Sequence, residues 1–185
     1  MRILPKTFNE ALNLVCNILI QGDSRYNNSE NEVFLANSIL NEIINLEEKE
    51  IPKINKPNEN NLLKMGYVQK HEKYVAKILL KQNGFQDSEI FFERRFRGSR
   101  PDVLGEKEEA FIPVECCSCR IDKIIDYLQE SEEVWIITRE FCNEEMKWFV
   151  FKKGLNWQRY SKIKKIQQEK LKRIKSPLDD IMGRK

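Results

Sequence analysis

The chain has 185 residues, of which 33% are charged, yet its net charge is only +3. This length can bury an ordinary hydrophobic core without disulfide staples, and the small net charge by itself identifies no partner. No stretch approaches the roughly 18 apolar residues that a membrane helix needs, and the apolar run near the start lacks the flanks of a signal peptide. These features predict a soluble, cytoplasmic protein with no membrane partner.

The charge is unevenly distributed along the chain. Residues 151–175 carry ten Lys and Arg against one acid, Glu169, whereas residues 1–70 carry eight Lys and Arg against nine Asp and Glu. A basic segment of this kind is typical of a surface that contacts a polyanion, although a lysine-rich helix can also be a plain solvated face. The C-terminal end is therefore the first candidate for a binding surface.

The first part of the chain predicts two amphipathic helices. Apolar residues recur at helical spacing in residues 7–20 and again from Ser29 to about Lys49, and Ser29 with Glu32 matches a capping box. The segment IPKINKPNENN, with two prolines and four asparagines, then predicts a linker, because neither helix nor sheet is easily sustained there. We therefore assign residues 1–62 to an N-terminal helical extension and its linker.

After the linker the predicted elements follow the order helix, three strands, helix, strand. A helical pattern over residues 65–85 includes Gly84, and glycine is the residue type that most often ends a helix. The later predictions are strands at 88–96, 100–106 and 110–119, a helix at 121–131, strands at 133–138 and 147–153, and a basic helix at 156–175. This order divides the remaining chain into a core, residues 63–154, and a basic C-terminal helix and tail, residues 155–185.

Two carboxylates of this core, Asp102 and Glu115, are the first candidates for a functional site. Side chains alternate along a strand, so Glu115 is expected on the face opposite Val114 and Cys116, at the sheet surface away from the core. If the flanking strands pair as an antiparallel hairpin through GEKEEA, Asp102 and Glu115 become cross-strand neighbours. A cation would relieve their repulsion, and oxygen ligands select a hard ion such as Mg²⁺ or Mn²⁺.

A third acid, Glu72, lies on the helix that precedes these strands. Val75, Ala76 and Leu79 follow it by three, four and seven positions, so Glu72 belongs to the apolar stripe that faces the sheet. A carboxylate on such a stripe requires a partner or a position at the rim. A divalent metal at the edge of the same sheet would supply that partner.

These features together resemble the core of the PD-(D/E)XK nuclease superfamily, over about residues 68–138. The residues that carry the resemblance are Glu72, the RPDVLG segment and the PVECCSC strand. The resemblance implies an α/β fold with a restriction-endonuclease-like core, a four-stranded mixed sheet flanked by helices. It also implies that Asp102, Glu115 and the backbone carbonyl of Cys116 bind Mg²⁺ or Mn²⁺, with Glu72 as an auxiliary acid. The implied activity is hydrolysis of phosphodiester bonds in DNA.

The chain departs from the family pattern at Cys117, where the family has a lysine that orients the attacking water and stabilises developing negative charge. Cysteine cannot replace it, because a thiol carries no positive charge and a thiolate has the wrong sign. Arg120 and Lys123 follow closely, at the start of the next helix, and we predict Lys123 as the catalytic replacement. The alternative is a catalytically inactive nuclease-fold protein that binds nucleic acid without cleaving it.

Two basic segments predict contacts with the DNA backbone, one before Asp102 and one in the C-terminal helix. The predicted contacts are Arg94, Arg95, Arg97, Arg100, Arg120, Lys162, Lys164, Lys165 and Lys172. The apolar residues of the terminal helix could instead form a stripe that packs on the core or on a second subunit. The chain is short for a sequence-reading domain, which favours a junction, a flap or an end as substrate, and cleavage of both strands would suit a homodimer.

Other interpretations of these residues stay open. Cys116 and Cys119 form a C-x-x-C pair that could bind zinc or an iron–sulfur cluster, but on a strand their sulfurs face opposite ways, which favours apolar packing. Five cysteines without an export signal favour reduced thiols. His71, beside Glu72, fits a helix surface better than a catalytic role. The chain could also be a helical interaction protein whose acids are ordinary surface residues.

Overall fold

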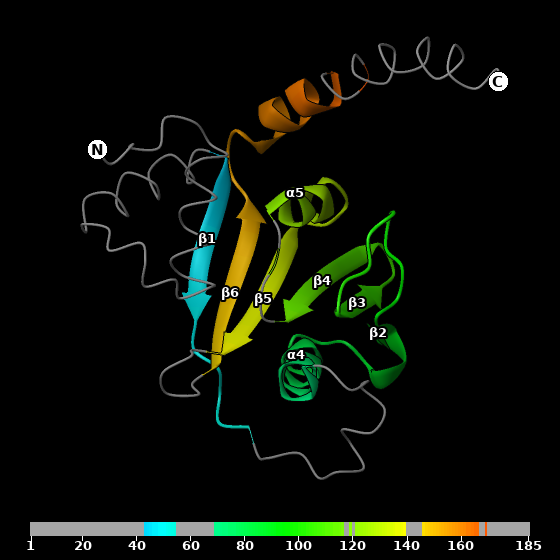
Figure 1. Ribbon diagram of the computed structural model, residues 1–185, viewed down its shortest axis with the longest axis vertical. Helices are drawn as coiled ribbons and strands as arrows, with labels where there is room; N and C mark the ends of the chain where they lie inside the picture. The colour runs from blue at the N-terminus through cyan, green and yellow to red at the C-terminus, as the bar shows by residue number, and fades with distance from the viewer. Residues whose placement is uncertain are drawn as a thin grey trace, which may run out of the picture.

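Six strands form a mixed sheet at the centre of the protein, in the order β1-β6-β5-β4-β3-β2 (Figure 1). The computed structural model describes residues 43–54, 69–116, 119, 121–139, 146–166 and 169. The strands are β1 (Ile44–Lys49), β2 (Ile90–Phe92), β3 (Val103–Lys107), β4 (Ala110–Cys116), β5 (Glu133–Arg139) and β6 (Met146–Lys153). The mixed α/β class is confirmed, whereas the four-stranded sheet is wrong because β6 and β1 extend it beyond β5.

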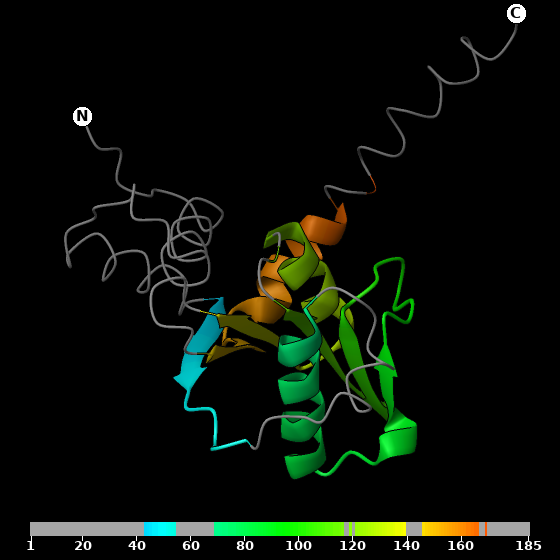
Figure 2. The ribbon, with the colours of Figure 1, turned by 60° about the horizontal axis from the view of Figure 1, so that its bottom comes forward.

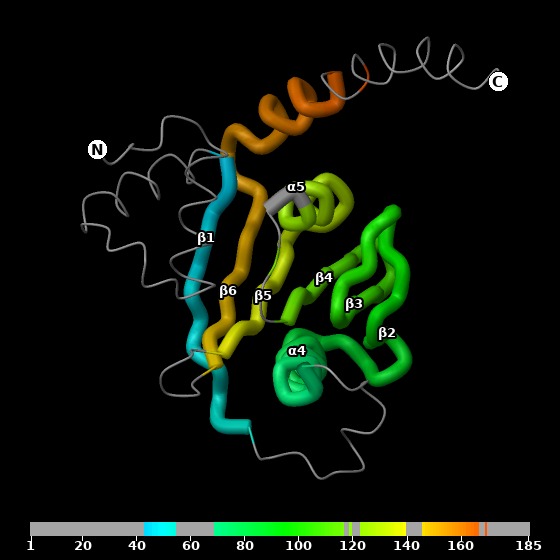
Figure 3. Tube along the Cα trace, in the orientation of Figure 1, coloured from blue at the N-terminus to red at the C-terminus, as the bar shows by residue number. Residues whose placement is uncertain are grey.

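The strand directions follow from the connections between them. The pairs β2–β3, β3–β4, β5–β6 and β6–β1 are antiparallel, while β4 and β5 are parallel. A parallel pair needs a crossover connection, and the helix α5 (Ile121–Glu130) provides it. The trace in Figure 3 shows the strands side by side from β1 to β2. The start of β3 and the end of β4 therefore lie at the open end of a hairpin, and the crossover to β5 begins from that end of β4.

Helices cover both faces of the sheet. The helix α4 (Lys70–Gln82) packs on one face and crosses in front of the strands in Figure 2. The opposite face is covered by α5 and by a helix over residues 157–166. Side chains of β5 alternate between the two cores, with Val134 and Ile136 on the α5 side and Trp135 and Ile137 on the α4 side. A strand buried on both faces has the continuous apolar sequence seen here.

The strand β1 corrects the prediction of a helix that continues to about Lys49. Residues Ile44–Lys49 pair with β6 instead, from Ile44 opposite Lys153 to Lys49 opposite Trp148. Ile44 is fully buried, and Leu46, two positions later, packs against the same core. Apolar residues two apart suit a strand, and pairing with β6 satisfies backbone groups that an edge would leave open. The helix over residues 7–20 and the earlier part of the second helix lie outside the described residues.

The helices predicted after the linker are confirmed in position: α4, α5 and the described part of the basic helix. The helix α4 ends at Gln82, and Gly84 follows with a φ of 92°, a left-handed conformation that glycine adopts at little cost. The basic helix is present over residues 157–166. Among the described helices, none has the length and apolar character that crossing a bilayer requires.

Candidate active site

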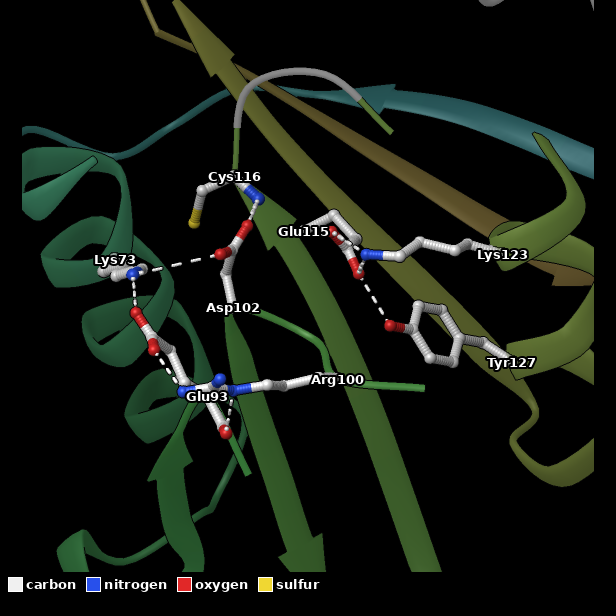
Figure 4. A network of polar contacts seen from close by, with 8 residues as sticks. All are labelled: Lys73, Glu93, Arg100, Asp102, Glu115, Cys116, Lys123 and Tyr127. Carbon is white, nitrogen blue, oxygen red and sulfur yellow. Dashed lines mark hydrogen bonds and ion pairs between the residues drawn. The ribbon is translucent and has the colours of Figure 1, made fainter. Parts of the chain in front are cut away.

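Asp102 and Glu115 lie opposite one another at the open end of the β3–β4 hairpin, away from the turn at residues 108–109. The strands pair with Val103 opposite Val114, and the same register continued by one position sets Asp102 against Glu115. The backbone N–H of Cys116 donates a hydrogen bond to Oδ2 of Asp102 at 2.8 Å, which ties the end of β4 to the residue that starts β3. The hairpin expected from the sequence is therefore present, and it presents both carboxylates in one region (Figure 4).

Glu115 is buried and held by two donors from α5. Its side chain is 5% exposed, and Lys123 Nζ lies 2.9 Å from Oε1 and 3.1 Å from Oε2. The hydroxyl of Tyr127 donates to Oε1 at 2.6 Å. Lys123 and Tyr127 are four residues apart, so they lie on the same side of the helix. The expectation that Glu115 lies away from the core is wrong, because α5 covers this face of the sheet.

The burial of this group changes its titration. Burial raises the pKa of the Glu115 carboxyl above its ordinary value, and this outweighs the hydrogen bonds from Tyr127 and Lys123, which lower it. Burial would lower the pKa of Lys123, but its hydrogen bond to Glu115 and the attraction between the two charges raise the pKa overall. Burial and the hydrogen bond to Glu115 raise the pKa of Tyr127, so the phenol remains a donor. The site thus has a cation, a donor and a desolvated carboxylate in contact.

A second lysine, Lys73, lies beside Asp102. It belongs to the first turn of α4, its side chain is 1% exposed, and its Nζ lies 3.8 Å from Oδ1 of Asp102 and 2.8 Å from Oε1 of Glu93. The hydrogen bond from Lys73 lowers the pKa of Glu93. Arg100 binds the other side of Glu93, at 2.5 Å from Oε2 and 2.6 Å from its carbonyl oxygen. A chain of contacts from Arg100 through Glu93 to Lys73 therefore supports Asp102 (Figure 4).

Glu72, the predicted auxiliary acid, is buried on α4 but has a different described partner. Its Oε1 lies 3.4 Å from Nε of Arg139, at the end of β5. Consecutive residues on a helix point about 100° apart, and here Lys73 is directed toward Asp102 while Glu72 is directed toward Arg139. The apolar stripe correctly indicates that Glu72 faces the sheet, and its catalytic role stays a prediction.

Most of the predicted arginine contacts are engaged within the protein. Three arginines of the segment before Asp102 form ion pairs: Arg94 with Glu106, Arg97 with Glu130, and Arg100 with Glu93. Arg95 is exposed and has no ion pair among the described residues. Of the predicted lysines, Lys164 pairs with Asp126, whereas Lys162 and Lys165 are exposed. Arg120 and Lys172 lie outside the described residues.

The cysteine pair does not form a shared thiolate site. Cys116 and Cys119 are both buried thiols. Cys116 belongs to the core on the α4 side of the sheet and Cys119 to the core on the α5 side. Their packing in separate apolar clusters agrees with the interpretation that favoured structural, reduced thiols.

The two carboxylates suit a hard divalent cation. Within the described residues, no group of three or more His, Cys, Asp or Glu side chains could hold a metal ion. Asp102 and Glu115 nevertheless supply carboxylate oxygens at one end of the sheet, and Asp102 is 23% exposed and so open to solvent. Burial and, less strongly, the charge of Asp102 raise the pKa of Glu115. A bound cation would offset both the cost of burying the Glu115 charge and its repulsion from Asp102. The remaining ligands would be carbonyl, water or substrate oxygens.

Comparisons of the chain with models of protein families, with curated proteins and with solved structures found no match. Function must therefore be inferred from the residues themselves. Two of them, Lys73 and Tyr127, were not among the predicted site residues. Tyr127 could have been found from its position four residues after Lys123. Lys73 shares a stripe with Ala76 and Leu80, at spacings of three and seven, which marks it as sheet-facing.

Proposed function

We propose that the protein is a Mg²⁺- or Mn²⁺-dependent DNA endonuclease that hydrolyses phosphodiester bonds. The observation that carries this proposal is the contact between Lys123 and Glu115, at 2.9 Å. The residue two positions after Glu115 in the sequence is Cys117, which offers no positive charge. Lys123 reaches the same carboxylate from α5 and supplies that charge from a neighbouring element.

The arrangement of elements also supports the proposal. The strands β2, β3, β4 and β5 are adjacent and in chain order, α4 precedes them, and α5 joins β4 to β5. This is the helix, three strands, helix, strand order on which the nuclease resemblance depends. The two further strands lie beyond β5, at the edge away from the hairpin of Asp102 and Glu115. They enlarge the sheet without interrupting that core.

Each residue of the site has a defined task in this proposal. Asp102, Glu115 and the carbonyl of Cys116 would hold the cation, which when bound stabilises negative charge on the phosphate and activates water. Lys123 stabilises the negative charge that develops on the substrate oxygens. Tyr127 fixes the orientation of Glu115, and Lys73 balances the charge of Asp102. The substrate would be a junction, a flap or an end, and a homodimer would bring two such sites to opposite strands.

Cleavage assays with matched variants test the proposal. Purified protein is incubated with duplex, single-stranded and four-way-junction DNA in Mg²⁺, Mn²⁺ or EDTA, beside Asp102→Asn and Glu115→Gln. Both substitutions are nearly isosteric, so loss of activity in a folded variant reports loss of the carboxylate charge. We expect metal-dependent cleavage that both variants abolish. DNA binding without cleavage would favour the noncatalytic nucleic-acid-binding protein, and cleavage that survives Asp102→Asn would place the active site elsewhere.

A further inference from the structure

A basic groove lies between the end of β6 and the helix of residues 157–166. Its volume is about 710 Å³. Its charged and hydroxyl-bearing lining consists of Glu132, Lys153, Arg159, Ser161, Lys162 and Lys165. The one acid of this lining is already neutralised, because Nζ of Lys153 lies 2.7 Å from Oε1 of Glu132. The groove therefore carries a net positive charge.

Three of its cations are free to bind a ligand. Arg159, Lys162 and Lys165 are exposed and, among the residues that the structure describes, have no ion pair. They recur every three positions, so they line one side of the helix. Nearby lysines outside the groove differ, since Lys164 pairs with Asp126 at 2.9 Å and Lys152 pairs with Glu47 at 3.0 Å. Unneutralised positive charge is thus concentrated in the groove.

The groove is displaced along the sheet from the carboxylates. It begins at Glu132, just before β5, whereas Glu115 pairs opposite Ile136 of the same strand. Four residues of a strand span on the order of 13 Å. For a duplex whose axis runs along β5, with a rise of about 3.4 Å per base pair, this displacement corresponds to roughly four base pairs.

We propose that this groove binds the phosphodiester backbone of the DNA, roughly four base pairs from the phosphate at Asp102 and Glu115. A regular polyanion fits a row of regularly spaced cations, and release of its counterions supplies affinity without base contacts. The groove would fix the position of the substrate relative to the carboxylates. This role rests on the proposed function, but binding in the groove requires neither metal nor chemistry.

The first test measures binding in the absence of catalysis. Fluorescence anisotropy with labelled duplex DNA is performed in EDTA, on Asp102→Asn protein that carries either Arg159→Gln with Lys162→Gln or Lys81→Gln with Lys152→Gln, whose lysines pair with Asp87 and Glu47. The two double variants remove the same charge, from inside and from outside the groove. We expect the groove variant to lose at least about tenfold in affinity and its salt slope to fall by about 1.8, with less than about a twofold loss in the control. Equal losses in the two variants, or none in either, would overturn the groove as a DNA contact.

The second test locates the contact on the substrate. Single phosphates of the duplex are replaced by neutral methylphosphonates at successive positions from the mapped cut. A neutral phosphate about four base pairs away should weaken binding by protein with the intact groove and leave the groove variant unaffected. Equal weakening of both proteins at every position would place the groove contact elsewhere and overturn its proposed register. If no cleavage occurs but the groove variant alone loses affinity, the nuclease proposal fails and the groove remains a binding site.

Discussion

At the scale of single residues, the proposed role of Lys123 predicts how its substitution changes the cleavage rate. If its charge stabilises the transition state, Lys123→Met should lower kcat at least about 100-fold while KM changes little. Lys123→Arg keeps the charge with a different geometry and should retain part of the activity. Lys81→Met is the matched control, because Lys81 lies on α4 and pairs with the exposed Asp87. Single-turnover cleavage rates test this prediction. An unchanged rate in Lys123→Met would mean that Lys123 only neutralises the charge of Glu115.

The raised pKa of Glu115 predicts how the stability of the fold depends on pH. Its pKa in the folded protein is raised above 4.5, so the folded state holds the proton more tightly than the unfolded state does. This group therefore stabilises the fold most at acidic pH, and the stabilisation is lost as pH rises through the raised pKa. Glu115→Gln should raise the free energy of unfolding at pH 8 by on the order of 1 kcal/mol and change it little near pH 4.

Urea unfolding at the two pH values measures this effect, with Asp102→Asn as the control for loss of a nearby carboxylate. The attraction between Lys123 and Glu115 opposes the gain, but the side chain of Lys123 is 35% exposed and can be hydrated when its partner is neutral. A Glu115→Gln protein that is less stable at pH 8 would show that the ion pair outweighs the cost of burial. Either outcome measures what Glu115 contributes to the stability of the fold, independently of its proposed role in cleavage.

Local sequence defined much of the candidate site. Strand alternation placed Glu115 and Val114 on opposite faces of β4. The turn between β3 and β4 then brought Asp102 opposite Glu115. Lys123, predicted as the replacement cation, contacts Glu115, and its catalytic role stays a prediction. The support for Asp102 was harder to foresee, because Lys73 comes from a helix on the other face and its direction depends on how α4 packs across the sheet.

At the scale of elements, β1 is where sequence reasoning failed. The residues INLEEK include good helix formers, and their apolar positions also fit a helical stripe. Their pairing is decided by β6, about 100 residues later in sequence, whose edge they complete. The other strands were recognised because each has apolar residues on both sides or alternates clearly. The other edge strand, β2, consists of three apolar residues, whereas β1 has only two apolar residues among six and so has a weaker local signature.

The junction between β1 and β6 can be tested through glycines. A Cβ at Gly154 would lie 2.8 Å from the carbonyl carbon and oxygen of Ile43, so Gly154→Ala forces the backbone apart. A Cβ at Gly105 would lie 2.8 Å from Cδ2 of Leu80, at the tip of a side chain that can shift. We expect Gly154→Ala to cost about 1–3 kcal/mol of unfolding free energy and Gly105→Ala less. Urea unfolding measures both, and the reverse order would mean that the segment before β1 adapts freely.

At the scale of the whole molecule, the sheet separates the two proposed sites in space. The hairpin of β3 and β4 presents the carboxylates, while the opposite end of β5 and β6 adjoins the basic groove. The rigid strand β5 connects the two, because it is buried on both faces. A fixed spacing between a reactive site and a backbone contact is what a nuclease without a sequence-reading domain needs to position its substrate.

The order of strands in the sheet indicates that the chain requires β1 for a stable fold. A chain that starts at residue 43 and one that starts at residue 55 differ only in β1 and the residues that follow it, so their difference reports the contribution of this strand. Burial of Ile44, which is fully buried, contributes about 1.5–3 kcal/mol, and the ladder with β6 adds to it.

We therefore expect the shorter chain to lose at least about 2 kcal/mol of unfolding free energy and to self-associate through the uncovered edge of β6. Urea unfolding and light scattering, on both chains at the same concentration, measure the two effects. Equal stability of the two chains would mean that the core begins after the linker, near residue 62, where the composition of the sequence placed the boundary. A large difference would make β1 part of the core that positions the carboxylates.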